Sequence, residues 1–155
     1  MGERKVALEW YQRIVTVAHG HYRAALRFSR LHYWFSFPSI ILATIVGTSV
    51  FASLETQPEL WLKIAVGSMS IAVAILSALQ SFLNYVDKAE KHKTAGAKYN
   101  ALGRELELVL SQDKEWSSLP DIRRKIDSLA QESPHIPESV HEEMRIDPET
   151  LLWNQ

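Results

Sequence analysis

Two long blocks without a charged side chain constrain this sequence more than any other feature. Residues 31–54 and residues 64–86 contain no Asp, Glu, Lys or Arg, and each block holds at least ten Ile, Leu, Val or Phe residues. A helix needs about 20 mostly apolar residues to cross roughly 30 Å of hydrocarbon. Each strongly apolar residue contributes roughly −0.3 to −0.6 kcal/mol to insertion, or about −3 to −6 kcal/mol per block before polar costs. The sequence therefore predicts two membrane-spanning helices.

A soluble bundle with two fully buried central helices is the alternative interpretation. A chain of 155 residues could hardly surround two such helices with apolar partners on every side. Aromatic residues mark the block ends: Tyr33 and Trp34 open the first, Trp61 precedes the second, and Tyr85 lies near its end. Such residues favour the headgroup region of a bilayer. We therefore expect an all-α membrane protein, a two-span transmembrane helical hairpin with long cytoplasmic helical extensions, and we expect it to be oligomeric.

Basic residues near the block ends predict the orientation of the hairpin. Nine lie outside it, namely Arg13, Arg23, Arg27, Arg30, Lys88, Lys91, Lys93, Lys98 and Arg104, whereas the connection at residues 55–63 contains only Lys63. Cytoplasmic segments carry the excess of Lys and Arg. Both termini are therefore expected in the cytoplasm and the connection outside it. The first 30 residues have no secretory signal pattern, so internal segments are expected to drive insertion.

Helical patterning continues on both sides of the hairpin. Before it, apolar or aromatic residues recur at steps of four and three: Trp10, Ile14, Val17, His21, Ala24, Phe28 and Leu31. After it the pattern continues through Ala95, Tyr99, Leu102, Leu106 and Val109. We expect a cytoplasmic helix over about residues 3–30 and one helix from about residue 64 to residue 110. The cytoplasmic parts of these two helices should pack together as a stalk. In the first span, Pro38 predicts a kink or a helix start.

This organisation predicts a domain at residues 1–110, with spans at 31–54 and 64–86 and a continuation at 87–110. Residues 111–155 would form a C-terminal helix and tail. A loop is expected at residues 111–117, and Ser118 to Asp121 has the form of a capping box with Pro120 in the first turn. The helix that follows should carry Ile122, Ile126 and Leu129 on its packed side.

The composition excludes several kinds of chemistry. The chain has no cysteine, so thiol nucleophiles and thiolate metal sites are absent, and its net charge of −1 gives no general attraction to nucleic acid. His19 and His21 lie on nearly opposite helix faces, and the other histidines stand alone in the sequence: His32, His92, His135 and His141. No phosphate-binding loop or hydrolase motif occurs. We expect no catalytic residue, no metal, no cofactor, no enzyme activity and no nucleic-acid partner.

A stripe of small and hydroxyl residues runs along the second block. Its members recur at steps of three and four: Gly67, Ser70, Ala74, Ser77, Ser81 and Asn84. Larger apolar residues, Ile71, Ile75, Leu79, Phe82 and Val86, would face lipid on the other side. Small stripes let membrane helices approach closely, and they also line water-filled paths in oligomers. Val66 and Val73 lie close to the stripe and argue against a wholly polar lumen, so both interpretations stay open.

Two further groups accompany this stripe. Lys88 and Lys91 continue its phase, so they would ring the cytoplasmic mouth of a pore or contact anionic lipid headgroups. In the first block, Ala43 and Gly47 form a pair of small residues four apart, with hydroxyls at Thr44 and Thr48 on a neighbouring line. These four are expected to pack the hairpin helices together.

Several segments taken together resemble the SLATT domain of bacteria. The resemblance rests on residues 21–25 (His-Tyr-Arg-Ala-Ala), Arg30, residues 45–51, residues 78–85, residues 89–92, and Ala95, Tyr99, Leu102, Arg104 and Glu105. It covers about residues 10–110, and Pro134 to Pro137 is similar to the tail of the family. The resemblance implies a two-helix membrane effector of a bacterial conflict system, located in the inner membrane. It also implies a pore-forming or depolarising activity in anti-phage defence or abortive infection.

The resemblance further implies a separate sensor, such as a nucleotide second-messenger synthase or a nucleotide-binding domain. Two helices cannot enclose a pore, so conduction would require a homo-oligomer of about four or more copies in the lipid bilayer. A second hypothesis is a non-conducting membrane anchor that docks a cytoplasmic partner through its stalk. A membrane-bound enzyme that uses the histidines is a third. Conductance separates the first two, because an anchor should show none.

Overall fold

The computed structural model describes residues 2–53, 59–112 and 116–146 of the chain. Its elements are α1 (Gly2–Ser53), α2 (Leu60–Leu83), α3 (Tyr85–Gln112), the 3-10 turn η1 (Trp116–Ser118), α4 (Leu119–Glu132) and α5 (Glu138–Ile146). No strand occurs within the described ranges. The predicted all-α fold is confirmed.

These elements divide into two compact units. One, the hairpin unit, comprises Phe28–Asp87 and holds the second half of α1 together with α2. The other, the bundle unit, comprises Met1–Arg27 and Lys88–Gln155 and holds the first half of α1, most of α3, and α4 and α5. The helices α1 and α3 each contribute to both units.

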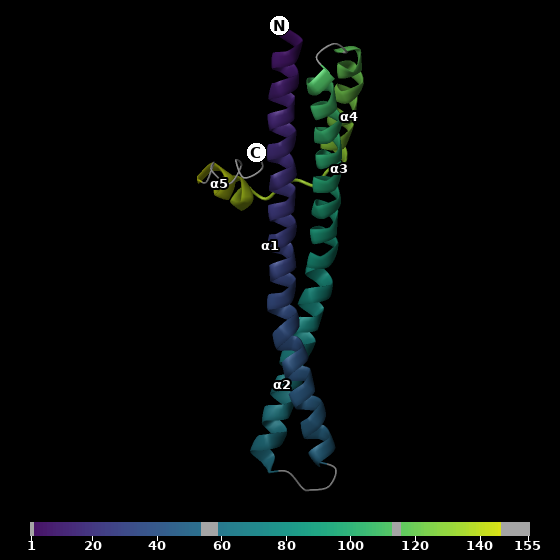
Figure 1. Cartoon of the computed structure of the whole chain (residues 1–155). Helices are drawn as coiled ribbons and strands as arrows, with labels where there is room; N and C mark the ends of the chain where they lie inside the picture. The colour runs from purple at the N-terminus through teal and green to yellow at the C-terminus, as the bar shows by residue number, and fades with distance from the viewer. Residues whose placement is uncertain (1, 54–58, 113–115, 147–155) are drawn as a thin grey trace. The chain divides into compact units, whose positions relative to one another are not determined.

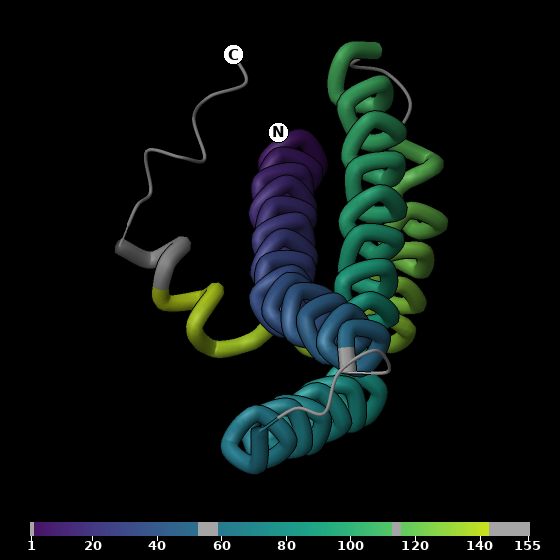
Figure 2. Tube along the Cα trace, turned by 90° about the horizontal axis from the view of Figure 1, so that it is seen from below, coloured from purple at the N-terminus to yellow at the C-terminus, as the bar shows by residue number. Residues whose placement is uncertain are grey.

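The bundle unit has an apolar core made by three helices. Within it the first half of α1 runs beside α3, and α4 lies along α3 (Figures 1 and 2). The predicted packing of the N-terminal helix against the helix after the second span is confirmed. The buried core residues are Ala7, Ile14, Ala18, Tyr99, Leu102, Leu106, Leu119, Ile122 and Leu129. Six of them lie on the predicted seams or on the predicted packed side of α4, whereas Ala7, Ala18 and Leu119 are further members that the pattern did not predict.

Small residues bring α1 and α3 close together in this unit. A Cβ atom added at Gly96 would lie 3.2 Å from the ring of Tyr22 and 3.3 Å from the carbonyl oxygen of Ala18. Ala18 and Ala24 on α1 and Ala95 on α3 are also buried. The absence of larger side chains at these positions allows the two backbones to approach.

The start of α4 differs in detail from the predicted capping box. Pro120 lies in the first turn, as expected, and Ser118 is the N-cap residue. The backbone of Ser118 is already helical (φ −81°, ψ −13°) because η1 runs directly into α4, and its side chain makes no capping hydrogen bond. An N-cap side chain needs extended backbone to reach back to the first turn. The helix is instead held by its buried side, Ile122 above all.

The expected single helix over about residues 64–110 is wrong. It is divided into α2 and α3 by Asn84, whose backbone is left-handed (φ 43°, ψ 50°). The amide of Asn84 still donates to the carbonyl of Gln80, at 3.1 Å, so α2 ends with a left-handed cap. Asparagine is one of the few residues other than glycine that adopts this conformation readily.

The hairpin unit exposes most of its apolar side chains. Two helical stretches of the described chain are long and apolar enough to span a bilayer, and only 6% and 0% of their most apolar windows are buried. The central helices of a soluble protein would be mostly buried. Pro38 lies inside α1, so no helix begins there. The molecule is an all-α, two-span membrane protein.

The connection between the spans is only partly described. Residues 54–58 lie outside the described ranges, and α2 begins at Leu60 rather than near residue 64. At the far end α3 continues to Gln112, into the segment expected to be a loop. Within the hairpin unit, α1 and α2 diverge toward their connection (Figure 1).

Candidate functional site

The second span has three distinct faces. The least exposed one carries half-buried residues at steps of three and four: Val66, Met69, Val73, Leu76, Gln80 and Leu83. Because α1 is the other helix of the hairpin unit, this face is the one turned toward α1. Val66 and Val73 therefore belong to the contact within the hairpin rather than to the small-residue stripe.

The small-residue stripe forms a second face and remains uncovered. Every member is exposed: Gly67, Ser70, Ala74, Ser77, Ser81 and Asn84. A Cβ atom added at Gly67 would meet nothing within 4 Å. The hydroxyl of Ser70 donates to the carbonyl of Val66, at 2.9 Å, so this group is satisfied by its own helix. The structure thus brings the predicted stripe together on one open face of α2.

The third face carries large apolar side chains. Ile71, Ile75, Leu79 and Phe82 are all exposed, with 85% of Phe82 accessible, and Val86 is also exposed beyond the break at Asn84. At about 100° per residue, the three faces point roughly 120° apart. This face is suited to lipid, because exposed apolar area of this size is costly in water.

The small residues of the first span are mostly exposed. Ala43, Thr44 and Thr48 are exposed, and Gly47 is half-buried with nothing within 4 Å of an added Cβ atom. Thr44 donates to the carbonyl of Ile40, at 2.9 Å, and Thr48 donates back to α1 in the same way. That these four residues pack the hairpin helices together stays a prediction.

Aromatic rings gather at the other end of the hairpin unit. The ring of Tyr85 stacks on Phe28 and on Phe35, with 6.1 Å between ring centroids in each pair. Tyr33 and Trp34 are exposed near this end, with 78% of Trp34 accessible, and Trp61 is exposed near the start of α2, beside the connection. Exposed Tyr and Trp at the ends of apolar helices are typical of the bilayer interface.

Lys88 and Lys91 lie in the bundle unit, near the start of α3, and both side chains are exposed.

The residue that follows Lys91, His92, is buried and forms a pair with a histidine of α1. His92 is 3% exposed, and it lies against His21 of α1, which is 2% exposed. Their Nδ1 atoms are 3.0 Å apart, and the ring of Tyr99 stacks on His21 at 5.5 Å. The expectation that His92 stands alone is therefore wrong.

The sequence carried a signal for this pair. His21 occupies a position of the α1 seam, and His92 precedes Ala95 by three residues, which extends the α3 seam by one step. Two seams that pack together bring such residues opposite each other.

Burial lowers the pKa of both imidazoles. The pKa of His21 falls to about 4, because the neighbouring imidazole of His92 adds to the effect of burial. Both rings are therefore neutral near pH 7.

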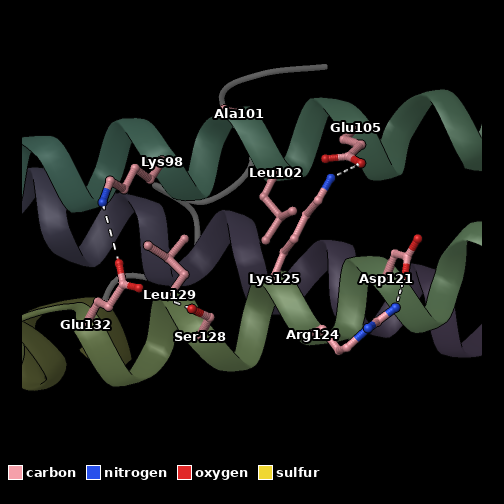
Figure 3. A pocket seen from close by; sticks show the side chains of 10 residues that line it. All are labelled: Lys98, Ala101, Leu102, Glu105, Asp121, Arg124, Lys125, Ser128, Leu129 and Glu132. Carbon is pink, nitrogen blue, oxygen red and sulfur yellow. Dashed lines mark hydrogen bonds and ion pairs between the residues drawn. The ribbon is translucent and has the colours of Figure 1, made fainter.

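A groove of about 720 Å³ lies between α3 and α4 in the bundle unit (Figure 3). Leu102 and Leu129 form its apolar floor. The charged groups around it are paired, as Figure 3 shows: Lys125 with Glu105 at 2.5 Å, Lys98 with Glu132 at 3.7 Å, and Arg124 with Asp121. Such exposed pairs contribute about 0–1 kcal/mol each. The groove presents no excess of one charge that would select an anionic or a cationic ligand.

No group of three or more His, Asp or Glu side chains within the described residues could hold a metal ion. The histidine pair alone offers two nitrogen atoms, which is fewer than the three or four protein ligands usual for zinc.

The family of SMODS and SLOG-associating 2TM effector domains, family 4, matches residues 5–140. No curated protein and no solved structure matches the chain. The match includes both spans, α3, α4 and the start of α5. With 136 of 155 residues matched, this chain belongs to family 4 of the SMODS and SLOG-associating 2TM effector domains, a SLATT family of membrane effectors of conflict systems.

Proposed function

We propose that this protein is a homo-oligomeric, pore-forming effector of a bacterial anti-phage or abortive-infection system. It would act without enzymatic chemistry in the inner membrane, with both termini in the cytoplasm. A separate sensor would activate it, and the SMODS and SLOG proteins in the family description are the candidates for that role. Activation would depolarise the membrane.

The observation that carries the proposal is the arrangement of the three faces of α2. The hairpin contact uses the half-buried face, and lipid suits the face with Ile71 and Phe82. The small-residue stripe belongs to neither face, and none of the described residues covers it. Serine is less favourable than leucine in hydrocarbon, so this face is the one best covered by something other than lipid.

Several copies of the chain would provide that cover. Arranged around an axis with their stripes inward, they would enclose a path lined by hydroxyl groups and small side chains. Lys88 and Lys91 follow the stripe along the chain and are exposed, so their positive charges would favour anions in such a path.

The test compares two serines of α2 that differ only in their face. Ser77 belongs to the stripe, whereas Ser68 lies on the lipid-facing side, and both are exposed. Ser77→Leu and Ser68→Leu make the same chemical change, and both should insert, because leucine favours hydrocarbon more than serine does. Ion release from liposomes and crosslinking would be measured on the same preparations.

We expect Ser77→Leu to abolish ion release and toxicity while the oligomer persists, and Ser68→Leu to behave like the parent protein. Loss of the oligomer in Ser77→Leu would instead identify the stripe as a packing surface between helices. Equal conduction by both variants would show that the stripe does not line the path.

A membrane anchor is the second candidate. The observation that favours it is the open groove between α3 and α4, whose apolar floor a partner protein could cover. An assembled parent protein that conducts no ions when supplied with a SMODS or SLOG sensor and the trigger of that sensor would favour this function over the pore.

A further inference from the structure

A small pocket lies between α1 and α4 within the bundle unit. Its volume is about 310 Å³. The described residues that line it are Trp10, Arg13, Ile14, Arg123, Ile126 and Asp127. Both helices contribute positions i, i+3 and i+4, which share one face of a helix, so two matching faces meet across the pocket. Small-molecule sites in proteins have volumes of about 300–1,000 Å³, so a pocket of this size suits one small molecule.

Three of the lining residues are apolar, and all three contribute to the core or pack against it. Ile14 is 2% exposed and is part of the core of the bundle unit. Trp10 and Ile126 are half-buried and pack against the same core. These side chains would remove the apolar body of a ligand from water, and a flat ring would also gain a stacking contact with the indole of Trp10. This part of the pocket therefore favours an aromatic ring.

The other three lining residues are charged, and two of them are arginines. Arg13 makes no ion pair or hydrogen bond with a described residue. Arg123 is paired with Asp127, with 3.7 Å between Nε and Oδ2, and both of these side chains are mostly exposed. An exposed pair of this kind is weak, and it uses only Nε of a guanidinium that has five N–H donors. Both arginines therefore keep donors for an anion at the pocket.

We propose that this pocket binds a small organic anion, namely an aromatic ring that carries a phosphate or a carboxylate group. The ring lies against Trp10, Ile14 and Ile126, and the anionic group lies between the guanidinium groups of Arg13 and Arg123. A guanidinium forms two parallel, charge-assisted hydrogen bonds with the oxygen atoms of either group. The site belongs to the bundle unit alone, so it goes beyond the proposed pore and holds whether or not the hairpin conducts ions.

Four related probes test the two halves of the site. Naphthyl phosphate and naphthoate contain both a ring and an anionic group, whereas naphthol lacks the anionic group and inorganic phosphate lacks the ring. Binding to the full chain in lipid nanodiscs would be measured by isothermal titration calorimetry, with the heat from empty nanodiscs subtracted because naphthol enters lipid. We expect at least one aromatic anion to bind about tenfold or more tightly than naphthol and inorganic phosphate. The tighter of the two aromatic anions identifies the anionic group of the natural ligand.

Two adjacent arginines of α4 supply a matched pair of variants. Arg123 lines this pocket, whereas Arg124 lines the groove beside α3, and each is exposed and paired with an aspartate. Arg123→Gln should weaken binding of the aromatic anion about tenfold or more, and Arg13→Gln should do the same from the other helix. Arg124→Gln makes the same chemical change and should leave the affinity within about twofold of the parent value.

Asp127 gives a prediction of the opposite sign. Its carboxylate competes with a bound anion for the guanidinium of Arg123. Asp127→Asn should therefore tighten binding of the aromatic anion about two- to fivefold. Damage to the structure of the pocket would weaken binding instead.

Three outcomes would overturn the proposal. They are the absence of binding by every probe, equal binding of naphthol and the aromatic anions, and equal affinities of Arg123→Gln and Arg124→Gln. Both of these arginine side chains are mostly exposed, so the two variants should unfold thermally at the parent temperature. A loss of affinity confined to Arg123→Gln is then a property of the pocket and not of the fold.

Discussion

At the scale of single residues, two glycines of α3 that look alike in the sequence have different surroundings. A methyl group added at Gly96 would lie 3.2 Å from the ring of Tyr22 and 3.3 Å from the carbonyl oxygen of Ala18. One added at Gly103 would meet only the Cγ2 atom of Ile14, at 3.4 Å. Alanine is more favourable than glycine inside a helix by about 1 kcal/mol. At Gly96 the added methyl group is crowded by the Tyr22 ring and by a backbone carbonyl, and both would have to shift by a few tenths of an ångström.

We therefore expect Gly103→Ala to be neutral or to stabilise the bundle unit by roughly 0.5–1 kcal/mol. Gly96→Ala should lose this gain and destabilise the unit by about 1 kcal/mol, because overpacking costs about 1–3 kcal/mol. Thermal unfolding in detergent, followed by circular dichroism, would compare the two. A stabilised Gly96→Ala protein would show that α1 and α3 do not approach closely there.

At the scale of the helices, the core of the bundle unit predicts which apolar residues matter. Leu106 is completely buried between helices, whereas Leu108, two residues further on the same helix, is 62% exposed. Leu106→Ala should lower the free energy of unfolding by about 2–5 kcal/mol, as for other large-to-small changes in a packed core. Leu108→Ala should change it by less than about 0.5 kcal/mol. Equal effects of the two changes, measured by denaturant unfolding, would contradict the packing of α3 against α1 and α4.

The helical seams were predictable because periodicity reports burial directly. Ile14, Tyr99, Leu102 and Leu106 follow steps of three and four, and all four are buried. The pairing of His21 with His92 was missed, because a seam gives the face of a residue and not its partner on the other helix. The break at Asn84 was missed as well. A single left-handed residue leaves the pattern of apolar residues on each side intact.

In the spans, too, the spacing of residues gives the face of each residue but not the helix that this face contacts. The sequence of α2 contains two seams with helical spacing, one through Val66 and Val73 and one through Ser70 and Ser77. Periodicity distinguishes their directions but does not tell which one contacts α1. The structure assigns the first seam to the hairpin, because its residues are half-buried while those of the stripe are exposed.

At the scale of the whole molecule, membership of the family and the two spans define a membrane effector, while the pore remains the proposal to be tested. The family match extends through residue 140, so it includes α4 and the groove beside α3. Within the described residues, the bundle unit is the part of the chain with a packed apolar core.

Water access to the stripe tests the central claim most directly. The chain has no native cysteine, so single cysteines can be placed along α2 of the otherwise unaltered protein and treated with a water-soluble thiol reagent in the assembled oligomer. We expect rapid modification of cysteines placed at Ser70, Ala74, Ser77 and Ser81. Cysteines placed at Ser68, Ile71 and Ile75 should react slowly, so that reactivity follows the periodicity of a helix. Uniformly slow modification at both sets of positions would contradict a water-filled path along this face.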